Sequence, residues 1–388
     1  MPTTSEMNWQ LEQSLTETVN EEVFGAAVSL SGDGTVVTVG AFMNSERAEG
    51  GGRIVRFDSN TETETEIYGL ELAYMGYQIS TSRTGNRLVT LDSNTGIFEL
   101  VEYNPEYATF QPVASVNPEV FPGSADFALS GDGKWLAIIG ETFDAETDLT
   151  SILLFMYEYD EESKRFVQYR ESTLFGQNES ENWGFFDVDM DYDGKFVVVS
   201  QIGQADFTGK VHVYERVATG MILKGEAFAS DTSNDGFGQD VEVLVNPAGQ
   251  VIVGFSVPYE DTVFVYTFEG DGWNMLGSPI IATDVLEDGT GSEFGFGISF
   301  SDEGDKLLVG APAYMNAAGA VQGYIFVDGD WLATGNPMGW YEGSSFGEVV
   351  ECNSDCSVIA VGAPLNCSDD STCGGAVYVF RDASRPKL

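Results

Sequence analysis

The sequence predicts an all-β protein, a seven-bladed β-propeller of four-stranded antiparallel blades. Three observations predict this fold: a pattern of about 50 residues that recurs seven times, strand-like alternation within each copy, and incomplete copies at the two ends of the chain. The turn residues of the copies are Gly34, Gly85, Gly133, Gly194, Gly249, Gly304 and Cys356, at spacings of 51, 48, 61, 55, 55 and 52 residues. Because the copies account for nearly all 388 residues, we expect one domain over residues 1–388.

The copy that begins at Phe24 shows the elements of one blade in order. Residues 28–31 alternate between apolar and small polar side chains, which is the period of two expected of a half-buried strand. An Asp-Gly turn leads into a second, apolar strand at residues 36–39, and after a longer loop a third strand follows at residues 53–57. A fourth strand is expected near a large apolar residue, as at Trp331 in a later copy. No segment has a convincing apolar period of 3.6 residues, and four-stranded units repeated at this interval are typical of β-propellers.

The two ends of the chain complete each other. Residues 9–15 resemble a fourth strand without the three strands that should precede it, whereas the chain stops soon after a third strand at residues 376–381. We therefore expect the N-terminal strand to complete the last blade, which leaves no open sheet edge at the seam.

The charge of the chain narrows its possible partners. There are 62 Asp and Glu residues against 17 Lys and Arg residues, which gives a formal charge of −45. Nucleic acid and anionic membrane surfaces are disfavoured because both require clustered basic residues. Divalent cations and cationic or neutral polymers remain as partners. With His212 as its one histidine, the chain cannot build a Ser-His-Asp, Cys-His or multi-histidine metal site by itself.

Short words recur at fixed places in the copies: Phe-Gly, then Ser-x-Asp-Gly, then Val-Gly-Ala-Pro. They are strongest in the copies that begin at Phe24, Phe294 and Phe346. These words resemble FG-GAP repeats, the units of the integrin α-subunit head propeller, and the resemblance covers nearly the whole chain. It implies a seven-bladed propeller used for adhesion or recognition, with calcium bound in some hairpin loops.

The fourth copy contains Asp189-x-Asp191-x-Asp193 followed by glycine, at the hairpin that binds Ca²⁺ in integrin-like repeats. Carboxylates at alternate positions can converge on an ion while the glycine lets the chain turn around it. The resemblance implies side-chain ligands at these three positions and a backbone carbonyl ligand from Lys195. The last acid of the family pattern is replaced by Val197, so one ligand is missing and the affinity should be weak. The alternative, which we favour, is a strand with one polar face that ends in an ordinary Asp-Gly turn.

Four cysteines lie close together near the C-terminus: Cys352, Cys356, Cys367 and Cys373. The strand between the two pairs, residues 357–363, spans about 23 Å at 3.3 Å per residue, whereas bridged Cα atoms lie within about 7 Å of each other. The spacing thus predicts a bridge within each pair, which indicates an oxidising compartment; four reduced cysteines in a cytosolic protein are the alternative. Glycosylation sequons at Asn178 and Asn366 fit a secreted, extracellular or cell-surface protein, although residues 1–10 show no signal-peptide pattern.

The loops between second and third strands are long and are expected to crowd one rim of the channel, where a rigid scaffold usually carries its binding residues. The candidate ligand-binding residues in these loops are Asp144, Glu146, Asp148, Tyr259, Glu260, Asp261, Tyr314, Asp369 and Asp370. We expect a non-enzymatic extracellular propeller that recognises a protein or glycan through this acidic rim, with calcium as an assisting ion. One alternative is a self-assembling building block of an extracellular matrix, envelope or fibre. A weaker one is a glycoside hydrolase, since carboxylate pairs are plentiful but no catalytic signature is present.

Overall fold

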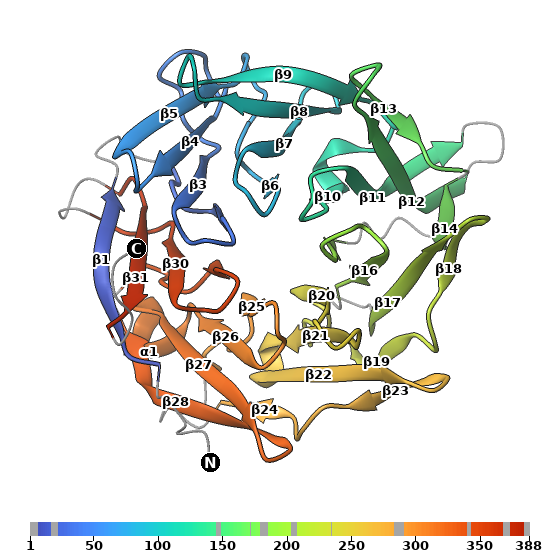
Figure 1. Ribbon diagram of the computed structural model, residues 1–388, viewed down its shortest axis with the longest axis vertical. Coiled ribbons are helices and arrows are strands. Elements are labelled where there is room, and N and C mark those ends of the chain that lie inside the picture. The colour runs from blue at the N-terminus through green and yellow to red at the C-terminus, as the bar shows by residue number, and fades with distance from the viewer. Residues whose placement is uncertain are drawn as a thin grey trace.

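The described residues form seven antiparallel sheets arranged in a ring (Figure 1). The computed structural model describes residues 7–16, 22–144, 149–170, 172–178, 185–202, 208–233, 235–282, 291–339, 343–367 and 373–383. Each sheet is one blade, and its strands follow one another from the centre of the ring to the outer wall. The prediction of an all-β, seven-bladed propeller is confirmed.

The blades are numbered from the first complete one. Blade 1 contains β2 (Ala27–Leu30), β3 (Val36–Ala41), β4 (Arg53–Asp58) and β5 (Thr63–Tyr68). Blade 2 contains β6 (Ile79–Thr81), β7 (Arg87–Asp92), β8 (Ile97–Asn104) and β9 (Thr109–Val116). Blade 3 contains β10 (Asp126–Leu129), β11 (Trp135–Asp144), β12 (Leu149–Asp160), β13 (Arg165–Gln168) and β14 (Thr173–Asn178). Blade 4 contains β15 (Phe186–Met190), β16 (Phe196–Gln201), β17 (Thr208–Val217), β18 (Gly220–Leu223) and β19 (Phe228–Ser233). Blade 5 contains β20 (Val241–Val245), β21 (Val251–Val257), β22 (Thr262–Glu269), β23 (Gly272–Met275) and β24 (Ile280–Ile281). Blade 6 contains β25 (Ile298–Phe300), β26 (Lys306–Ala311), β27 (Ala320–Val327) and β28 (Asp330–Gly339), and blade 7 contains β29 (Val350–Cys352), β30 (Val358–Ala363), β31 (Ala376–Asp382) and the N-terminal β1 (Trp9–Thr16).

The N-terminal strand closes the ring as predicted. β1 runs antiparallel to β31, from Trp9 opposite Asp382 to Thr16 opposite Ala376, and the order of the last sheet is β1-β31-β30-β29. The indole Nε1 of Trp9 also donates a hydrogen bond of 3.2 Å to the carbonyl of Cys356. Because β1 covers the outer edge of β31, blade 7 has four strands like its neighbours.

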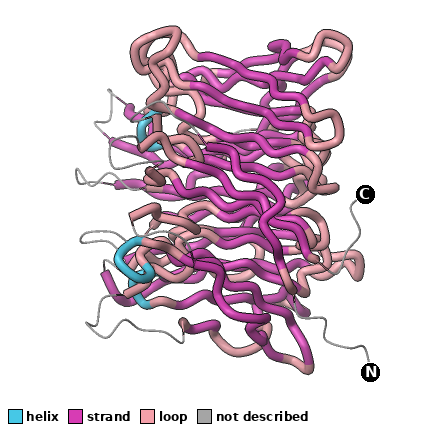
Figure 2. Tube along the Cα trace, turned by 90° about the vertical axis from the view of Figure 1, so that its left-hand side faces the viewer, coloured by secondary structure: helices cyan, strands magenta, loops and turns pink. Residues whose placement is uncertain are grey.

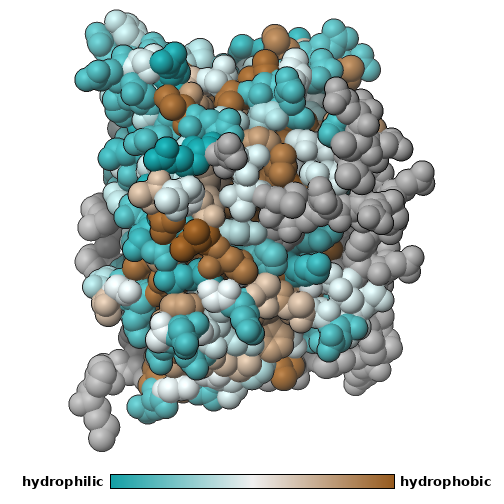
Figure 3. Space-filling model, turned by 90° about the vertical axis from the view of Figure 1, so that its right-hand side faces the viewer, coloured by the Kyte–Doolittle hydropathy of each residue, from teal (hydrophilic) through white to brown (hydrophobic). Residues whose placement is uncertain are grey.

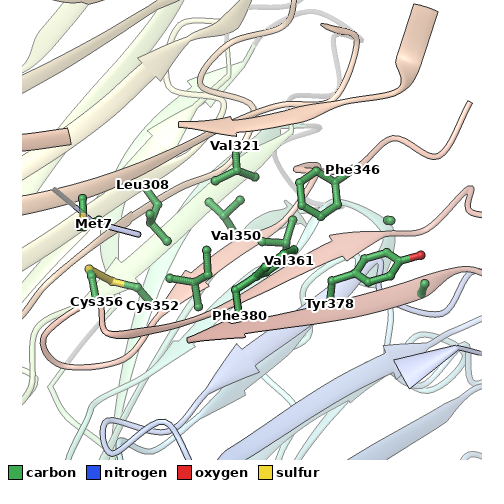
Figure 4. Packing of buried hydrophobic residues seen from close by; sticks show 13 residues of the cluster. Met7, Leu308, Val321, Phe346, Val350, Cys352, Cys356, Val361, Tyr378 and Phe380 are labelled. Carbon is green, nitrogen blue, oxygen red and sulfur yellow. A yellow bond between two sulfur atoms is a disulfide. The ribbon is translucent and has the colours of Figure 1, made fainter. Parts of the chain in front are cut away.

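The second strands form the centre of the core. β3, β21 and β30 are buried along their whole length, since each is covered on both faces by neighbouring blades. This double burial explains why these strands are continuous apolar runs while the first strands alternate. Figure 4 shows one such core in blade 7, where Val350, Val361 and Phe346 pack together beside the Cys352–Cys356 disulfide.

Glycines of the Phe-Gly and Val-Gly-Ala-Pro motifs bring neighbouring blades into contact. The Phe-Gly glycine Gly347 donates its N–H to the carbonyl of Gly362 in its own blade, at 3.0 Å. Its carbonyl meanwhile lies against the α-carbon of Gly310, which belongs to the Val-Gly-Ala-Pro word of the preceding blade. A Cβ on Gly310 would fall far inside van der Waals distance of that carbonyl oxygen, so only glycine fits at this position.

The outer edge of blades 3, 4 and 5 differs from the expected single fourth strand. In these blades the third strand pairs with two short consecutive strands, as β17 does with β18 and β19. In blade 4 the break between β18 and β19 accommodates an aromatic side chain from the next blade. Trp273 Nε1 donates a hydrogen bond of 2.8 Å to the carbonyl of Lys224, the residue directly after β18. The following residue is Gly225, where a Cβ would lie 2.8 Å from the same indole nitrogen.

The helical segments are short turns at one end of the channel, where Figure 2 shows them on the left side of the ring. They are the 3₁₀ turns η1 (Pro122–Ser124) and η2 (Pro258–Glu260) and the single turn α1 (Tyr314–Ala317). In α1, Met315, Asn316 and Ala317 have φ values of 49°, 60° and 59°, so the turn is left-handed, which is costly for residues other than glycine. Within the described ranges, no helix has the length and hydrophobicity that a membrane span would need.

Candidate functional site

The first strands of the blades line a central channel, which has two different ends. We call the end with the hairpins between first and second strands the turn rim. The other end, the loop rim, carries the loops between second and third strands and the loops that enter each new blade. Two cavities of about 440 and 530 Å³ occupy the channel, towards the turn rim and the loop rim respectively. Both are lined by Asp189, Glu242 and Glu351.

Carboxylates in the channel accept hydrogen bonds from the backbone of the next blade. Asp187 accepts from the N–H of Val241 at 2.7 Å, and Asp189 accepts from the N–H of Val243 at 2.9 Å. Asp240 and Glu242 repeat the arrangement one blade further, with the N–H groups of blade 6. The inner edge of a first strand has N–H groups without a partner strand, and these carboxylates satisfy them.

In other blades a hydroxyl takes the same place. Ser80 Oγ accepts from the N–H of Leu129 at 2.8 Å, and Ser299 Oγ accepts from the N–H of Cys352 at 3.1 Å. The channel carboxylates are therefore first of all structural acceptors that join consecutive blades.

Burial and mutual repulsion raise the pKa of these carboxyls. Burial is the main cause for each of them, and it brings the pKa of Asp189 and Asp191 to about 7. The pKa of Glu351 is raised to about 8, although the nearby Arg83 opposes the shift. Burial also raises the pKa of Glu348, near the loop rim, to about 7. Several channel carboxyls thus titrate near neutral pH rather than near 4.

Asp126 of blade 3 and Asp240 of blade 5 each lie within hydrogen-bonding reach of Asp187 of blade 4. Burial raises the pKa of Asp126 and of Asp240, and the proximity of each to Asp187 raises it further. Burial also raises the pKa of Asp187, while its hydrogen bonds with the other two lower it. Burial and close approach therefore disfavour the ionisation of all three carboxyls at once.

At the turn rim, consecutive hairpins are hydrogen-bonded to one another. Ser354 N donates to Gly32 O at 3.0 Å, Gly32 N donates to Arg83 O at 2.7 Å, and Arg83 N donates to Gly131 O at 2.8 Å. The guanidinium of Arg83 also forms an ion pair with Asp302, which belongs to blade 6 while Arg83 belongs to blade 2. Arg83 therefore crosses the mouth of the channel, where it faces the carboxylates Glu351, Glu242 and Asp189.

The predicted calcium hairpin has the contacts of an ordinary turn. Asp191 Oδ1 accepts from the N–H of Phe196 at 2.7 Å. Ser31, Ser130, Ser301 and Asn353 make the equivalent bond, to the residue five positions later, in their own hairpins.

Of the other proposed ligands, Asp193 lies within hydrogen-bonding reach of Asp191, whereas the remaining two have other partners. Asp189 is directed into the channel, Asp193 is exposed, and the carbonyl of Lys195 accepts a hydrogen bond of 2.7 Å from the N–H of Arg216. Among the described residues, no three His, Cys, Asp or Glu side chains are grouped so that they could hold a metal ion. The geometry favours the turn interpretation, and calcium binding stays a prediction.

The loop residues predicted to bind a ligand have different environments. Asp144, Tyr259 and Glu260 are exposed at the loop rim. Tyr314 lines a cavity between blades 5 and 6. Glu146, Asp148, Asp369 and Asp370 lie outside the described residues.

Asp261 is buried rather than presented to solvent. Its carboxylate accepts from the N–H of Ser292 at 3.0 Å, from the hydroxyl of Ser292 at 2.9 Å and from the N–H of Phe294 at 3.0 Å. These bonds fix the loop that enters blade 6, so Asp261 is not available to a ligand at the rim, whereas its neighbours Tyr259 and Glu260 are exposed.

The cysteines pair as the spacing predicts, Cys352 with Cys356 and Cys367 with Cys373. Of the two sequon asparagines, Asn178 ends β14. Asn366 is buried, and its Oδ1 accepts a hydrogen bond of 3.2 Å from the hydroxyl of Tyr378. The amide of Asn366 is therefore engaged inside the fold.

Sequence reasoning missed an apolar surface on the loop rim. More than half of the exposed large apolar side chains of the described residues lie in its loops or at the strand ends beside them: Met43, Leu70, Leu72, Tyr74, Tyr77, Ile97, Phe121, Phe143, Phe185, Tyr259, Ile281, Met315 and Leu365. Figure 3 shows one side of the ring wall, where apolar residues are interspersed with hydrophilic ones. The signal in the sequence was the run of apolar residues between fourth and first strands, such as Leu70 to Tyr77.

The fold is shared with known proteins. No protein-family model matches the chain, and no curated protein sequence matches it. A chain of hydrazine synthase from Kuenenia stuttgartiensis is similar in structure with a TM-score of 0.59 at 14% identity, over 97% of this chain and 100% of that chain. A chain of the mitotic checkpoint complex is similar with a TM-score of 0.55 at 10% identity, over 98% of this chain and 94% of that one. Oligogalacturonate lyase in complex with manganese is similar with a TM-score of 0.52 at 11% identity, over 97% of this chain and 96% of that one. These proteins differ in function and are distant in sequence, so the likeness shows a propeller fold alone.

Proposed function

We propose that this chain is a non-enzymatic recognition propeller of the FG-GAP type that binds a protein or glycan through its loop rim. The observation that carries the proposal is the concentration of exposed apolar side chains on the loop rim, next to exposed acids such as Glu260. Exposed apolar surface with a polar surround is typical of interaction sites, and aromatic residues contribute most to such contacts.

The use of the channel carboxylates supports binding rather than catalysis. A hydrolase needs a carboxyl pair whose oxygens are available to substrate and water. Here Asp187, Asp189, Asp240 and Glu242 each have an oxygen committed to a backbone N–H of the next blade. The FG-GAP resemblance supports the same choice, with calcium as an assisting ion.

The disulfides support an oxidising, extracellular location for this activity. The strong net negative charge then favours partners that are cationic or neutral.

The test compares rim tyrosines with a matched tyrosine elsewhere. Tyr77→Ala and Tyr259→Ala remove side chains that are 54% and 49% exposed on the loop rim, whereas Tyr107→Ala removes one that is 65% exposed at the hairpin of β8 and β9. Binding is measured on a glycan array and in pull-downs from extracellular fluid, with calcium and with chelator. It should weaken about tenfold or more in the rim variants, because each removes an aromatic side chain that the partner would bury. Tyr107→Ala should bind like the unmodified protein.

Three outcomes would contradict the proposal. Equal binding by all three variants would remove the loop rim from consideration. Salt- or calcium-dependent self-assembly without any captured partner would favour a structural building block. Hydrolysis of chromogenic glycosides, lost in Asp187→Asn, would favour an enzyme.

A further inference from the structure

A cavity of about 340 Å³ lies between blades 5 and 6, away from the central channel. Its walls come from the β24 edge of blade 5 and from β26, β27 and β28 of blade 6, in the lower part of Figure 1. Aromatic side chains form much of the wall: Phe294, Tyr314, Tyr324 and Trp331. The volume is at the small end of the range of roughly 300–1,000 Å³ typical of small-molecule sites.

The cavity exists because blade 6 has a glutamine, Gln322, at the position where blade 7 has the larger aromatic residue Tyr378. Gly310 pairs with Val321 in blade 6, and Gly362 pairs with Val377 in blade 7, so the following residues, Gln322 and Tyr378, occupy equivalent places. In blade 7 the Tyr378 ring fills this place beside Phe346, with ring centroids 5.9 Å apart (Figure 4). In blade 6 Gln322 leaves the corresponding space open, and the surrounding residues do not close it.

The amide of Gln322 is held so that its oxygen has no donor. Gln322 is 9% exposed, and its Nε2 donates both hydrogens, to the carbonyls of Gly323 and Thr334, at 2.9 Å each. Because the nitrogen is identified by these two bonds, the position of Oε1 is fixed as well. Among the described residues no group donates to Oε1, and this oxygen is not one of the fully enclosed polar atoms, so a donor the size of water can reach it.

The cavity also contains a carboxylate acceptor, alongside serine and tyrosine hydroxyls that can both donate and accept. Asp330 accepts from the N–H of Ser278 at 2.8 Å, and this bond, with one from the N–H of Trp331, lowers its pKa and keeps it ionised. The hydroxyls of Ser278 and Ser292 donate to the carboxylates of Asp330 and Asp261. No Lys, Arg or His lines the described walls of the cavity, so an anionic ligand would have no counter-charge.

We propose that this cavity binds a small organic amine with an apolar body, whose N–H groups donate to Gln322 Oε1 and whose positive charge faces the aromatic wall and Asp330. An apolar body gains from the aromatic and aliphatic walls, and an ammonium is favoured by aromatic faces and by a carboxylate. The site is separate from the loop-rim surface of the proposed function and does not depend on it.

The test is a titration of the intact chain with three probes of similar size: 2-phenylethylamine, 2-phenylethanol and 3-phenylpropanoate, followed by ligand-observed NMR and calorimetry. The amine should bind saturably, more tightly than the alcohol, and the carboxylate should not bind. Gln322→Met keeps the length of the side chain but removes the acceptor, and it should weaken amine binding about tenfold. Gln322→Tyr reproduces blade 7 and should abolish binding by filling the cavity.

A separate variant guards against loss of folding. Asp330→Asn retains a hydrogen-bond acceptor for Ser278 but removes the negative charge. It should therefore reduce the ratio of the affinity for the amine to the affinity for the alcohol. Melting temperatures of all variants show whether the fold is intact. Equal binding of 3-phenylpropanoate, amine binding that persists in folded Gln322→Tyr, or no saturable binding of the amine at millimolar concentration would each overturn the proposal.

Discussion

The protein should lose thermal stability as the pH rises from about 6.5 to 8.5, the opposite of the usual behaviour of acidic groups held in salt bridges. The cause is the set of channel carboxyls with raised pKa: Asp189, Asp191 and Glu348 at about 7 and Glu351 at about 8. In the unfolded chain, Asp and Glu titrate near 4.

The sign follows from the proton counts. Between pH 4 and 8 the folded state holds more protons on these carboxyls than the unfolded state, so the free energy of unfolding falls as the pH rises. Each carboxyl contributes a loss of about 1.4 kcal/mol per pH unit over the range in which it is protonated only in the folded state. Two carboxyls titrating together would therefore cost about 3 kcal/mol per pH unit, or a few degrees in melting temperature for a chain of this size.

One group acts in the opposite direction at lower pH. Burial lowers the pKa of His212 to about 4, so the unfolded state binds its proton below about 6.5, and there this one group partly offsets the fall in stability caused by the carboxyls. Above pH 6.5 the histidine no longer contributes, so the carboxyls alone determine how stability changes with pH.

A single substitution tests the origin of the effect. Glu351→Gln removes a carboxyl whose pKa is raised to about 8 while keeping its shape, so it should raise the melting temperature at pH 8 and flatten its pH dependence. Glu106→Gln removes the same charge from an exposed loop and should leave the slope unchanged. Added NaCl or CaCl₂ should reduce the loss, because cations screen the repulsion in the channel. A melting temperature that is flat between pH 6.5 and 8.5 in low salt would show that the carboxyls do not govern stability.

The parts of the fold that the sequence predicted are those set by local pattern. Alternation over residues 28–31 and the apolar run at 36–39 specify a hairpin without reference to the rest of the chain. The closure by residues 9–15 followed from counting strands. The split outer strands could not be predicted, because the break after β18 depends on Trp273, which belongs to the next blade.

The candidate site was harder to predict for the same physical reason. Asp187 and Asp189 alternate with apolar residues in β15 and face the channel, but the N–H groups that they bind lie 54 residues further along the chain. Asp261 has the local sequence of an exposed loop, and its burial depends on Ser292, 31 residues away. Comparing the copies with one another would have identified Gln322 as a polar residue where blade 7 has an aromatic one, but only the structure shows that its oxygen lacks a donor.

Gly310→Ala should destabilise the protein by about 3 kcal/mol or more, which is large for the addition of one methyl group. Gly310 has an ordinary strand conformation within β26, so alanine is acceptable to the backbone there. The cost arises between blades, because the new Cβ would overlap the carbonyl of Gly347. Gly310 is held in the sheet by its pairing with β27, and Gly347 is held by the bond from its N–H to Gly362, so neither can move away easily. Relief would require blades 6 and 7 to separate.

A glycine with no neighbours supplies the control. Gly272 begins β23, and a Cβ there would meet no atom within 4 Å, so Gly272→Ala should be neutral or slightly stabilising, by up to about 1 kcal/mol. Urea unfolding of the two variants measures the difference directly. The same close approach joins Gly40 to Gly76 and Gly362 to Gly25, so Gly40→Ala and Gly362→Ala should behave like Gly310→Ala. If all three resemble Gly272→Ala, the recurring glycines do not set the spacing of the blades, and their repetition in the sequence would need another physical cause.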